Sequence, residues 1–581
     1  MNPEPGTRNP EPGTRNPEPG TRNPEPGTRN PEPGTRNPDI WDTVRHDRRV
    51  LVVLRNPAAE NRLWDLVRPL AADPRLAVVF TVDDGPTDDG SEDSSSDFSG
   101  GLPARLTELG AHRLPWAEAI EERFDLALAA SDKTELHRVK TPVVLMAHGA
   151  GFNRRTKDNA NEISGLLRTA LVHDGGIVPA CVVVAHERDL ATLRAIDPRL
   201  PARALVAGDP AHHRIVRNLP LRERFRDALA VGERKLVLLC STWGEHSLFG
   251  RNPRLPHDLV YALPVDEFAV AMTMHPNVWA RHLELEVRAL TRTATDGGLR
   301  LIPAHGEWRS ALVAADLVIS DHGSLTVYGA AAGRPVLFAA DGGDEVVPGS
   351  MMDRLRRALP HLRTGEPLEP QITAALARGA RDVALAASSF AAHDALAAIL
   401  ARAYEIMDLP VSPYPTGNDA LPAPDVTLRE PAAFRVVLTG AHESGGHATL
   451  RLHRVAEPPR NPVEERPEDG HLVVNEYSDD IEALENASAI FSGVPHPTFD
   501  QARTRARRLL NAFRGARMAV AETIDGRRAA VLRDGREPTV LGELPISLVC
   551  SGLHWWSLTP DRPHRITVES GTISGPMTIN D

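Results

Sequence analysis

Cysteine and long apolar runs are scarce in this sequence. Its 581 residues include three cysteines, Cys181, Cys240 and Cys550, which are too few and too scattered for a disulfide framework or a cysteine-rich zinc module. No apolar run approaches the roughly 18 residues of a membrane-spanning helix, and the N-terminus lacks the basic and then apolar profile of a signal peptide. These absences suit a reducing compartment, and we expect a soluble cytoplasmic protein.

Positive charge is also limited. Lys and Arg total 66 against 78 Asp and Glu, which gives a net charge of −12, and only four of the cations are lysines. An acidic chain without a basic block argues against a general nucleic-acid binder. Hydrophobic residues, at 41%, and charged residues, at 25%, are present in ordinary amounts, so most of the chain can bury a core.

The N-terminus is a repeat. Five copies of Asn-Pro-Glu-Pro-Gly-Thr-Arg follow Met1 and fill residues 2–36. Each copy has two prolines and no apolar residue, so it can neither bury a core nor fill the seam of a coiled coil. We expect residues 1–38 to be disordered and extended. A Pro-rich docking tract is the alternative, functional interpretation.

Two series of short apolar runs alternating with amphipathic segments follow the repeats. Apolar strands that alternate with helices are typical of a parallel sheet covered on both faces. The first unit, at 39–218, has expected strands at 50–54, 77–82, 125–129, 143–147, 180–185 and 204–207. The second unit, at 219–408, has expected strands at 236–240, 268–274, 299–302, 317–320 and 336–339. Its expected helices are 278–293, 307–315, 325–332 and 390–407. The predicted fold class is therefore α/β, with two tandem Rossmann-like doubly wound domains.

The rest of the chain has a different pattern. A Pro-rich stretch predicts a linker at 409–425, and the acidic, Ser- and Gly-rich stretch at 83–101 predicts a solvated loop. Residues 426–581 mix alternating strands with one basic helix at 501–514, which predicts a small α+β domain of unknown role. Two doubly wound units joined by one linker imply a cleft, and ligands of such sheets bind at the carboxyl ends of the strands.

Two of the predicted strands end in histidine. The first runs from Val143 into His148-Gly149, which places an imidazole at the strand tip, where it can act as a general base near neutral pH. The second ends in His275-Pro276, and the proline opens the following helix, whose N-terminus suits a phosphate. A turn histidine without a function is the alternative for His148, and His-Pro taken alone is a common pair and a weak signal.

A third strand ends in a dense group of small polar residues. Ser320, Asp321, His322, Gly323 and Ser324 follow a buried strand and open a helix rich in Ala and Gly. The free N–H groups of a helix start, with the hydroxyls of the two serines, form a cradle for an anion such as a diphosphate. An ordinary capped helix without a ligand is the alternative.

Together these segments resemble the CDP-glycerol glycerophosphotransferase family, the teichoic-acid polymerases and primases, within the wider two-Rossmann (GT-B) glycosyltransferase architecture. The resemblance covers residues 49–407. The family's landmarks have counterparts, in order, at His148-Gly149, Ala207-Gly208-Asp209-Pro210, Ser241-Thr242-Trp243, His275-Pro276, Ser320-Asp321-His322-Gly323-Ser324 and Arg334-Pro335-Val336. The sequence departs from the family after His148-Gly149, where Ala150-Gly151-Phe152-Asn153 replaces Thr-Pro-Leu-Lys, and in the phosphate motif, where His322 and Gly323 replace tyrosine and serine.

The resemblance implies a transferase of cell-envelope polymer synthesis, with a nucleotide-diphosphate donor and a hydroxyl acceptor. His148 would deprotonate the acceptor, and His275, Ser320, Ser324 and the helix start would hold the leaving diphosphate. Gly149 would allow close approach of a ligand, and Thr242 and Trp243 would line the nucleotide pocket. This interpretation requires no metal and no cofactor and allows peripheral membrane contact. It leaves the nucleotide base, the transferred group, the acceptor and the oligomeric state open.

Two other functions compete with this one. A nucleotide-sugar epimerase shares the architecture and would need carboxylates near His148, where the sequence offers none in a persuasive position. A catalytically silent nucleotide-binding or scaffold protein is favoured by the altered segment after His148.

One further motif resembles a zinc site. His442 and His447 resemble the zinc-protease pattern, but they are five residues apart with two glycines between them, and five helical residues turn the side chains about 140° apart. We predict a glycine hairpin turn between two strands there.

Overall fold

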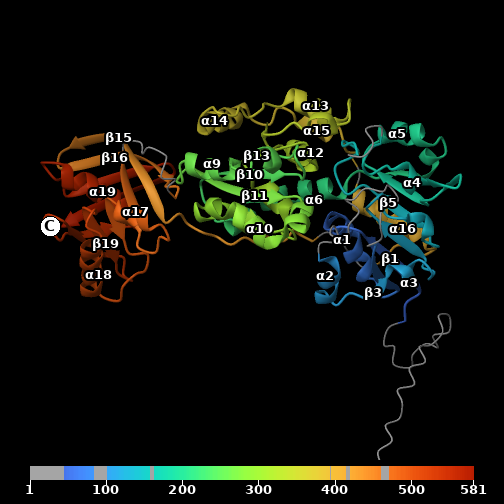
Figure 1. Cartoon of the computed structure of the whole chain (residues 1–581), viewed down its shortest axis with the longest axis horizontal. Helices are drawn as coiled ribbons and strands as arrows, with labels where there is room; N and C mark the ends of the chain where they lie inside the picture. The colour runs from blue at the N-terminus through green and yellow to red at the C-terminus, as the bar shows by residue number, and fades with distance from the viewer. Residues whose placement is uncertain are drawn as a thin grey trace, which may run out of the picture. The chain divides into compact units, whose positions relative to one another are not determined.

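Figure 1 shows the structure, a computed structural model, which describes residues 45–83, 101–156, 162–392, 394–413, 419–459 and 470–580. The repeats predicted to be disordered, and nearly all of the solvated loop predicted at 83–101, lie outside these residues. Among the residues that the structure describes, no helix is long and apolar enough to cross a membrane.

Seven parallel strands form one sheet, in the order β3-β2-β1-β4-β5-β8-β9, and this sheet with its helices is named the first lobe. The strands are β1 (Arg48–Leu54), β2 (Leu76–Val82), β3 (Arg113–Pro115), β4 (Leu126–Ala129), β5 (Val143–Met146), β8 (Cys181–Val184) and β9 (Ala204–Val206). A separate two-stranded ribbon consists of β6 (Val172–His173) and β7 (Gly176–Ile177). The helices are α1 (Pro57–Ala71), α2 (Leu102–Glu108), α3 (Trp116–Ala119), α4 (Arg168–Leu171), α5 (Asp189–Ile196) and α6 (Pro210–Asn218).

Alternate residues of β1 show why these strands are apolar throughout. Val50 and Val52 pack into one buried cluster, and Leu51 and Val53 pack into another on the opposite face. Since successive side chains of a strand point to opposite faces, helices on both sides of the sheet leave no polar position. The sequence prediction of a parallel sheet covered on both faces is confirmed for this lobe.

Five parallel strands form a second sheet, in the order β12-β11-β10-β13-β14, and this sheet with its helices is named the second lobe. The strands are β10 (Lys235–Ser241), β11 (Phe268–Met274), β12 (Arg300–Ile302), β13 (Leu317–Ser320) and β14 (Val336–Phe338). The helices are α7 (Arg222–Ala228), α8 (Leu248–Arg251), α9 (Leu255–Ala262), α10 (Pro276–Asp296), α11 (Trp308–Ala314), α12 (Ser324–Ala331), α13 (Met351–Ala358), α14 (Leu368–Arg378) and α15 (Val383–Ala387). Leu238 and Val237 of β10 belong to clusters on opposite faces, so this sheet too is covered on both sides.

Two helices differ from their sequence predictions. The helix predicted at 278–293 is α10, which is interrupted at Leu283, where φ is 59° and ψ is 161°. The last predicted helix, 390–407, is α16 (Ala395–Ile406), whose residues Ile399 and Ala403 pack in the core of the first lobe, although the sequence assigned it to the second unit. The apolar pattern of a helix shows that it packs on a sheet but not which sheet it reaches.

The C-terminal strands close into a nine-stranded barrel, in the order β15-β16-β22-β23-β21-β20-β19-β18-β17. They are β15 (Ala433–Ser444), β16 (His447–Ala456), β17 (His471–Asn475), β18 (Ala489–Phe491), β19 (Met518–Glu522), β20 (Arg528–Leu532), β21 (Thr539–Gly542), β22 (Arg565–Ser570) and β23 (Ile573–Asn580). The helices are α17 (Ile481–Glu485), α18 (Phe499–Ala512) and α19 (Ile546–Leu558). The sequence predicted an α+β domain but not that its sheet closes.

The barrel has two cores. Leu548, Leu553 and Trp556 of α19 pack with side chains from strands around the whole ring, so this helix lies against the inner face. The basic helix α18 packs its apolar stripe on the outer face of β19 and β20 (Figure 1). The predicted glycine hairpin is confirmed, because Ser444 of β15 pairs with His447 of β16 across a two-glycine turn.

Candidate active site

A cavity of about 300 Å³ lies between the two lobes. This volume is at the lower end of the range typical of small-molecule sites. Its lining comes from segments that directly follow strands of both sheets: Asn56 after β1, His148 after β5, Thr242 after β10, His275 after β11 and Ser324 after β13. The cavity is therefore at the carboxyl ends of both sheets, where the sequence predicted a cleft.

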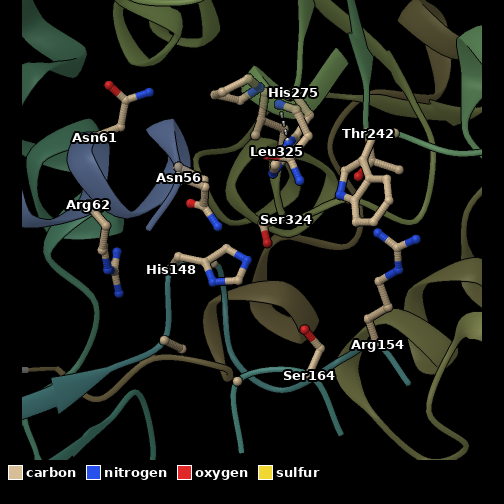
Figure 2. Close-up of a pocket in the computed structure, with 18 of the residues that line it drawn as sticks. Asn56, Asn61, Arg62, His148, Arg154, Ser164, Thr242, His275, Ser324 and Leu325 are labelled. Carbon is tan, nitrogen blue, oxygen red and sulfur yellow. Dashed lines mark hydrogen bonds between the residues drawn. The ribbon is translucent and has the colours of Figure 1, made fainter. Parts of the chain in front are cut away.

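His148 points into this cavity. Figure 2 shows its imidazole below Ser324, with Asn56 and Arg154 also facing the cavity. Burial lowers the pKa of His148 below its usual value, and the charges of Arg62 and Arg154 lower it further. Since the pKa falls, the ring is neutral at physiological pH and has a lone pair that can accept a proton.

Asp132 opposes the lowering of the pKa of His148. The sequence analysis did not identify this residue. It lines the cavity on the segment after β4, and its charge raises the pKa of His148, as does a hydrogen bond to the Ala130 carbonyl. The Asp132 side chain is buried, and its Oδ2 accepts the backbone N–H groups of Gly165 at 2.7 Å and Leu167 at 3.0 Å. Asp132 follows a buried strand just as His148 does, so the same signal could have found it.

His275 faces the same cavity from the second lobe. Its Nδ1 accepts the backbone N–H of Asn277 at 3.1 Å, which caps α10. Burial lowers the pKa of His275 to about 3, and the nearby His148 and Arg154 add to the effect. The ring is therefore neutral, and because Nδ1 is an acceptor, its proton is on Nε2, which is a hydrogen-bond donor.

Ser324, the first residue of α12, joins the two lobes. Its Oγ accepts the backbone N–H of Ala150 from the first lobe at 3.0 Å. Gly149 is equally close, since a Cβ built there would lie 2.4 Å from this oxygen. The structure thus brings His148 and Ser324 together, as the sequence predicted, although the hydroxyl also has a structural partner.

The side chains of Ser320 and Asp321 form hydrogen bonds that fix the conformation of the turn before α12. Ser320 is buried and donates its hydroxyl to the Cys240 carbonyl at 3.2 Å. Asp321 is fully buried, and its carboxylate accepts three backbone N–H groups, from Thr242 and Leu248 at 2.8 Å and from Gly323 at 2.9 Å. Burial raises the pKa of Asp321 against the opposing effect of His322 and these hydrogen bonds. Both side chains fix the start of α12 against the segment that follows β10.

His322 also has an internal partner. Its side chain is almost completely buried, and its Nε2 lies 3.0 Å from Glu345. The same carboxylate lies 2.6 Å from a guanidinium nitrogen of Arg154. Glu345 therefore joins a predicted phosphate residue of the second lobe to an arginine of the first lobe that was not predicted.

Thr242 and Trp243 lie beside the helix start. A Cβ at Gly323 would come within 3.2 Å of the Thr242 Cβ, so any larger residue there would push the Thr242 side chain away by a few tenths of an ångström. The guanidinium carbon of Arg154 lies 4.6 Å from the centroid of the Trp243 ring. Both predicted nucleotide-pocket residues line the cavity, and one face of the tryptophan is covered by Arg154.

A buried group of charges crosses between the lobes, and Arg62, Asp65 and Arg309 of this group line the cavity. Arg62 of α1 makes two hydrogen bonds to Asp209, at 3.1 and 2.8 Å, and the Tyr328 hydroxyl donates to the same carboxylate at 3.0 Å. Asp65 of α1 pairs with Arg309 of α11 at 2.6 Å. Asp209 belongs to the Gly-Asp-Pro turn at the end of the first unit, so this turn links α1 to α12 of the second lobe.

The arrangement combines a neutral imidazole from one lobe with a hydrogen-bonding helix start from the other. It can deprotonate a hydroxyl on one side and hold an anion on the other. Among the residues that the structure describes, no group of three or more His, Cys, Asp or Glu side chains is placed to hold a metal ion.

Comparisons with known proteins give distant structural likenesses. No family model and no curated protein sequence matches the chain. The structure of the wall teichoic acid polymerase TagF is 12% identical with a TM-score of 0.39, covering 62% of this chain and 87% of that one. HepE of Anabaena in complex with UDP-glucose is 14% identical with a TM-score of 0.34, covering 62% and 96%. MnaA of S. aureus with UDP is 12% identical with a TM-score of 0.39, covering 64% and 99%.

Proposed function

We propose that this protein is a transferase that moves a group from a nucleotide-diphosphate donor to a hydroxyl of an acceptor. The observation that carries the proposal is the pairing of His148 with the start of α12 in one cavity, held together by the Ala150–Ser324 hydrogen bond. A base on one side and an anion cradle on the other are the two parts that such a transfer needs.

On the acceptor side, His148 removes the proton of the attacking hydroxyl. Its lowered pKa keeps the ring neutral near pH 7, and Asp132 stabilises the imidazolium that forms when the proton arrives. Asn56 and Asn61 line the same half of the cavity and offer amide groups to the acceptor (Figure 2).

On the donor side, the diphosphate of the donor lies at the start of α12. The first N–H groups of a helix have no partner within the helix and carry its positive dipole end, so Ser324 and Leu325 offer donors to the phosphate. Nε2–H of His275 and the hydroxyl of Thr242 add two more. These groups stabilise the charge that develops on the leaving group. Asp321 and Ser320 act indirectly, by fixing the turn.

The finer assignment is to a glycosyl- or glycerophospho-transferase, and the products distinguish the two. Attack on a sugar carbon breaks the bond to the diphosphate and releases a nucleoside diphosphate. Attack on the distal phosphorus breaks the phosphoanhydride and releases a nucleoside monophosphate.

The test is to incubate the protein with CDP-glycerol, UDP-sugars and GDP-sugars, each together with a panel of hydroxyl acceptors such as glycerol phosphate and sugars, and to measure nucleotide release by chromatography. We expect release from one donor, and we expect the His148→Ala and His148→Asn variants to lose it while still binding the nucleotide. Nucleotide binding by the wild-type protein without any turnover would instead support the catalytically silent scaffold.

One observation favours a second function. A nucleotide-sugar epimerase needs a carboxylate near the imidazole, and Asp132 is close enough to shift the pKa of His148. Conversion of a UDP-sugar to its epimer without transfer, lost in Asp132→Asn, would establish this function in place of the transferase.

A further inference from the structure

Arg154 reaches from the first lobe into the half of the cavity that belongs to the second. It follows the His148-Gly149 turn and lines the cavity together with Trp243. Figure 2 shows it facing the cavity, as Ser324 also does. Its guanidinium stacks on the Trp243 ring at 4.6 Å and pairs with Glu345, which does not line the cavity, at 2.6 Å. The carboxylate thus holds the guanidinium from behind.

The second lobe offers little positive charge of its own to a ligand. Among the described residues that line its half of the cavity, Arg309 is the only lysine or arginine, and it is paired with two carboxylates, Asp65 and Glu307, whereas Arg154 is paired with one, Glu345. His275 is neutral at physiological pH because its pKa is about 3. A diphosphate brought to the start of α12 therefore meets neutral hydrogen-bond donors, and its charge is not balanced by this lobe.

We propose that Arg154 is the cation that neutralises the donor diphosphate, supplied by the first lobe to a ligand held by the second. The inference rests on the transferase function proposed above and adds a substrate-binding residue that neither the motifs nor the comparisons indicate. A guanidinium suits this role, since its planar donors match two phosphate oxygens and it stacks on an aromatic ring.

Two observations support a position of the Arg154 charge next to the proposed site of the donor diphosphate. Arg154 lowers the pKa of both His148 and His275, so its charge is close to the two imidazoles between which the transferred group must lie. The Ala150–Ser324 hydrogen bond holds the segment that precedes Arg154 against the helix start.

The experiment measures binding by isothermal titration calorimetry in the full-length protein. The ligands are the nucleoside, the monophosphate and the diphosphate of each of the four bases. The variants are Arg154→Gln, Arg154→Lys, Glu345→Gln, which keeps the arginine but removes its carboxylate partner, and Arg194→Gln as a control. Arg194 is an exposed arginine of α5 outside the cavity, so this control makes the same change of net charge.

We expect Arg154→Gln to weaken diphosphate binding by about 10- to 100-fold and nucleoside binding by less than about 3-fold. Arg154→Lys should bind the diphosphate more weakly than the wild type but more tightly than Arg154→Gln, because lysine keeps the charge but not the paired donors. Glu345→Gln and Arg194→Gln bind the diphosphate nearly as the wild type does.

Two outcomes overturn the inference alone: unchanged diphosphate binding in Arg154→Gln, or an equal loss for nucleoside and diphosphate. A loss in Glu345→Gln as large as that in Arg154→Gln also overturns it, since the arginine would then act only as a strut between the lobes. If the wild type binds none of the nucleotides, the proposed function falls and the role of Arg154 falls with it.

Discussion

The backbone N–H of Ala150 in the first lobe donates a hydrogen bond to the hydroxyl of Ser324 in the second lobe, across 3.0 Å. Gly149 lies beside the same hydroxyl, so closely that a Cβ there would come within 2.4 Å of it. His148 directly precedes this contact. The position of the proposed base relative to the proposed phosphate cradle is therefore set by a glycine and a serine from opposite sides of the cavity.

Gly149→Ala should reduce kcat/KM by between about 10- and 100-fold, because the new methyl group displaces the Ser324 hydroxyl and moves His148 away from the donor. The measurement is steady-state nucleotide release. Ser324→Ala removes the obstructing oxygen, so the double variant should be no slower than Ser324→Ala alone. Strictly additive losses would show that the two residues do not interact.

Asp132→Asn should move the acid limb of the kcat/KM profile to lower pH. The charge of Asp132 raises the pKa of His148, so removing the charge lowers that pKa, and the base then stays unprotonated to a lower pH. The measurement is kcat/KM from pH 5 to pH 9. An acid limb in the same place would show that His148 is not the titrating group.

Arg154→Gln should move the acid limb of the kcat/KM profile to higher pH. The charge of Arg154 lowers the pKa of His148, so its removal raises that pKa and the base becomes protonated at a higher pH. A shift of the same sign in both variants would contradict an electrostatic origin.

Asp209→Asn should lower the free energy of unfolding by about 3–5 kcal/mol, because it leaves Arg62 buried without its carboxylate. Tyr328→Phe removes one hydrogen bond to the same carboxylate and should cost about 1.5–3 kcal/mol. Asp227→Asn, at an exposed position of α7, should stay within about 0.5 kcal/mol of the wild type. Urea unfolding measures all three. Equal values for Asp209→Asn and Asp227→Asn would contradict the importance of the buried pair.

Acid should destabilise the protein through His275. The folded-state pKa of about 3 is below the ordinary value of about 6.5, so below pH 6.5 the unfolded chain binds a proton that the folded chain does not. Stability therefore falls as the pH falls, by about 2 kcal/mol between pH 6.5 and pH 5 from this group. His275→Asn keeps an acceptor for the Asn277 N–H but does not titrate there. Its stability, measured by urea unfolding at pH 7.5 and pH 5, should fall less than that of the wild type. Equal losses would show that His275 is not responsible.

Local sequence patterns predicted much of the fold. The apolar runs at 50–54 and 236–240 became β1 and β10, because strands covered on both faces need an unbroken apolar run. The residues after β5, β11 and β13 were identified as candidates because parallel strands bring their carboxyl ends to one edge of the sheet, where ligands bind. The pattern at 390–407 identified a helix but assigned it to the wrong core, because the sequence shows an apolar face and not the sheet that it meets.

The sequence by itself determined the two parallel sheets and the histidines at their strand ends, since both are written in residues that are neighbours along the chain. Only the tertiary structure decided that Asp132 lies beside His148, that Arg154 lies over Trp243, and that Asp321 turns inward to backbone amides. The first and the third join segments that follow different strands of one sheet, and the second joins the two lobes. They arise when strands align in a sheet and when the lobes pack together, and no spacing within one segment encodes them.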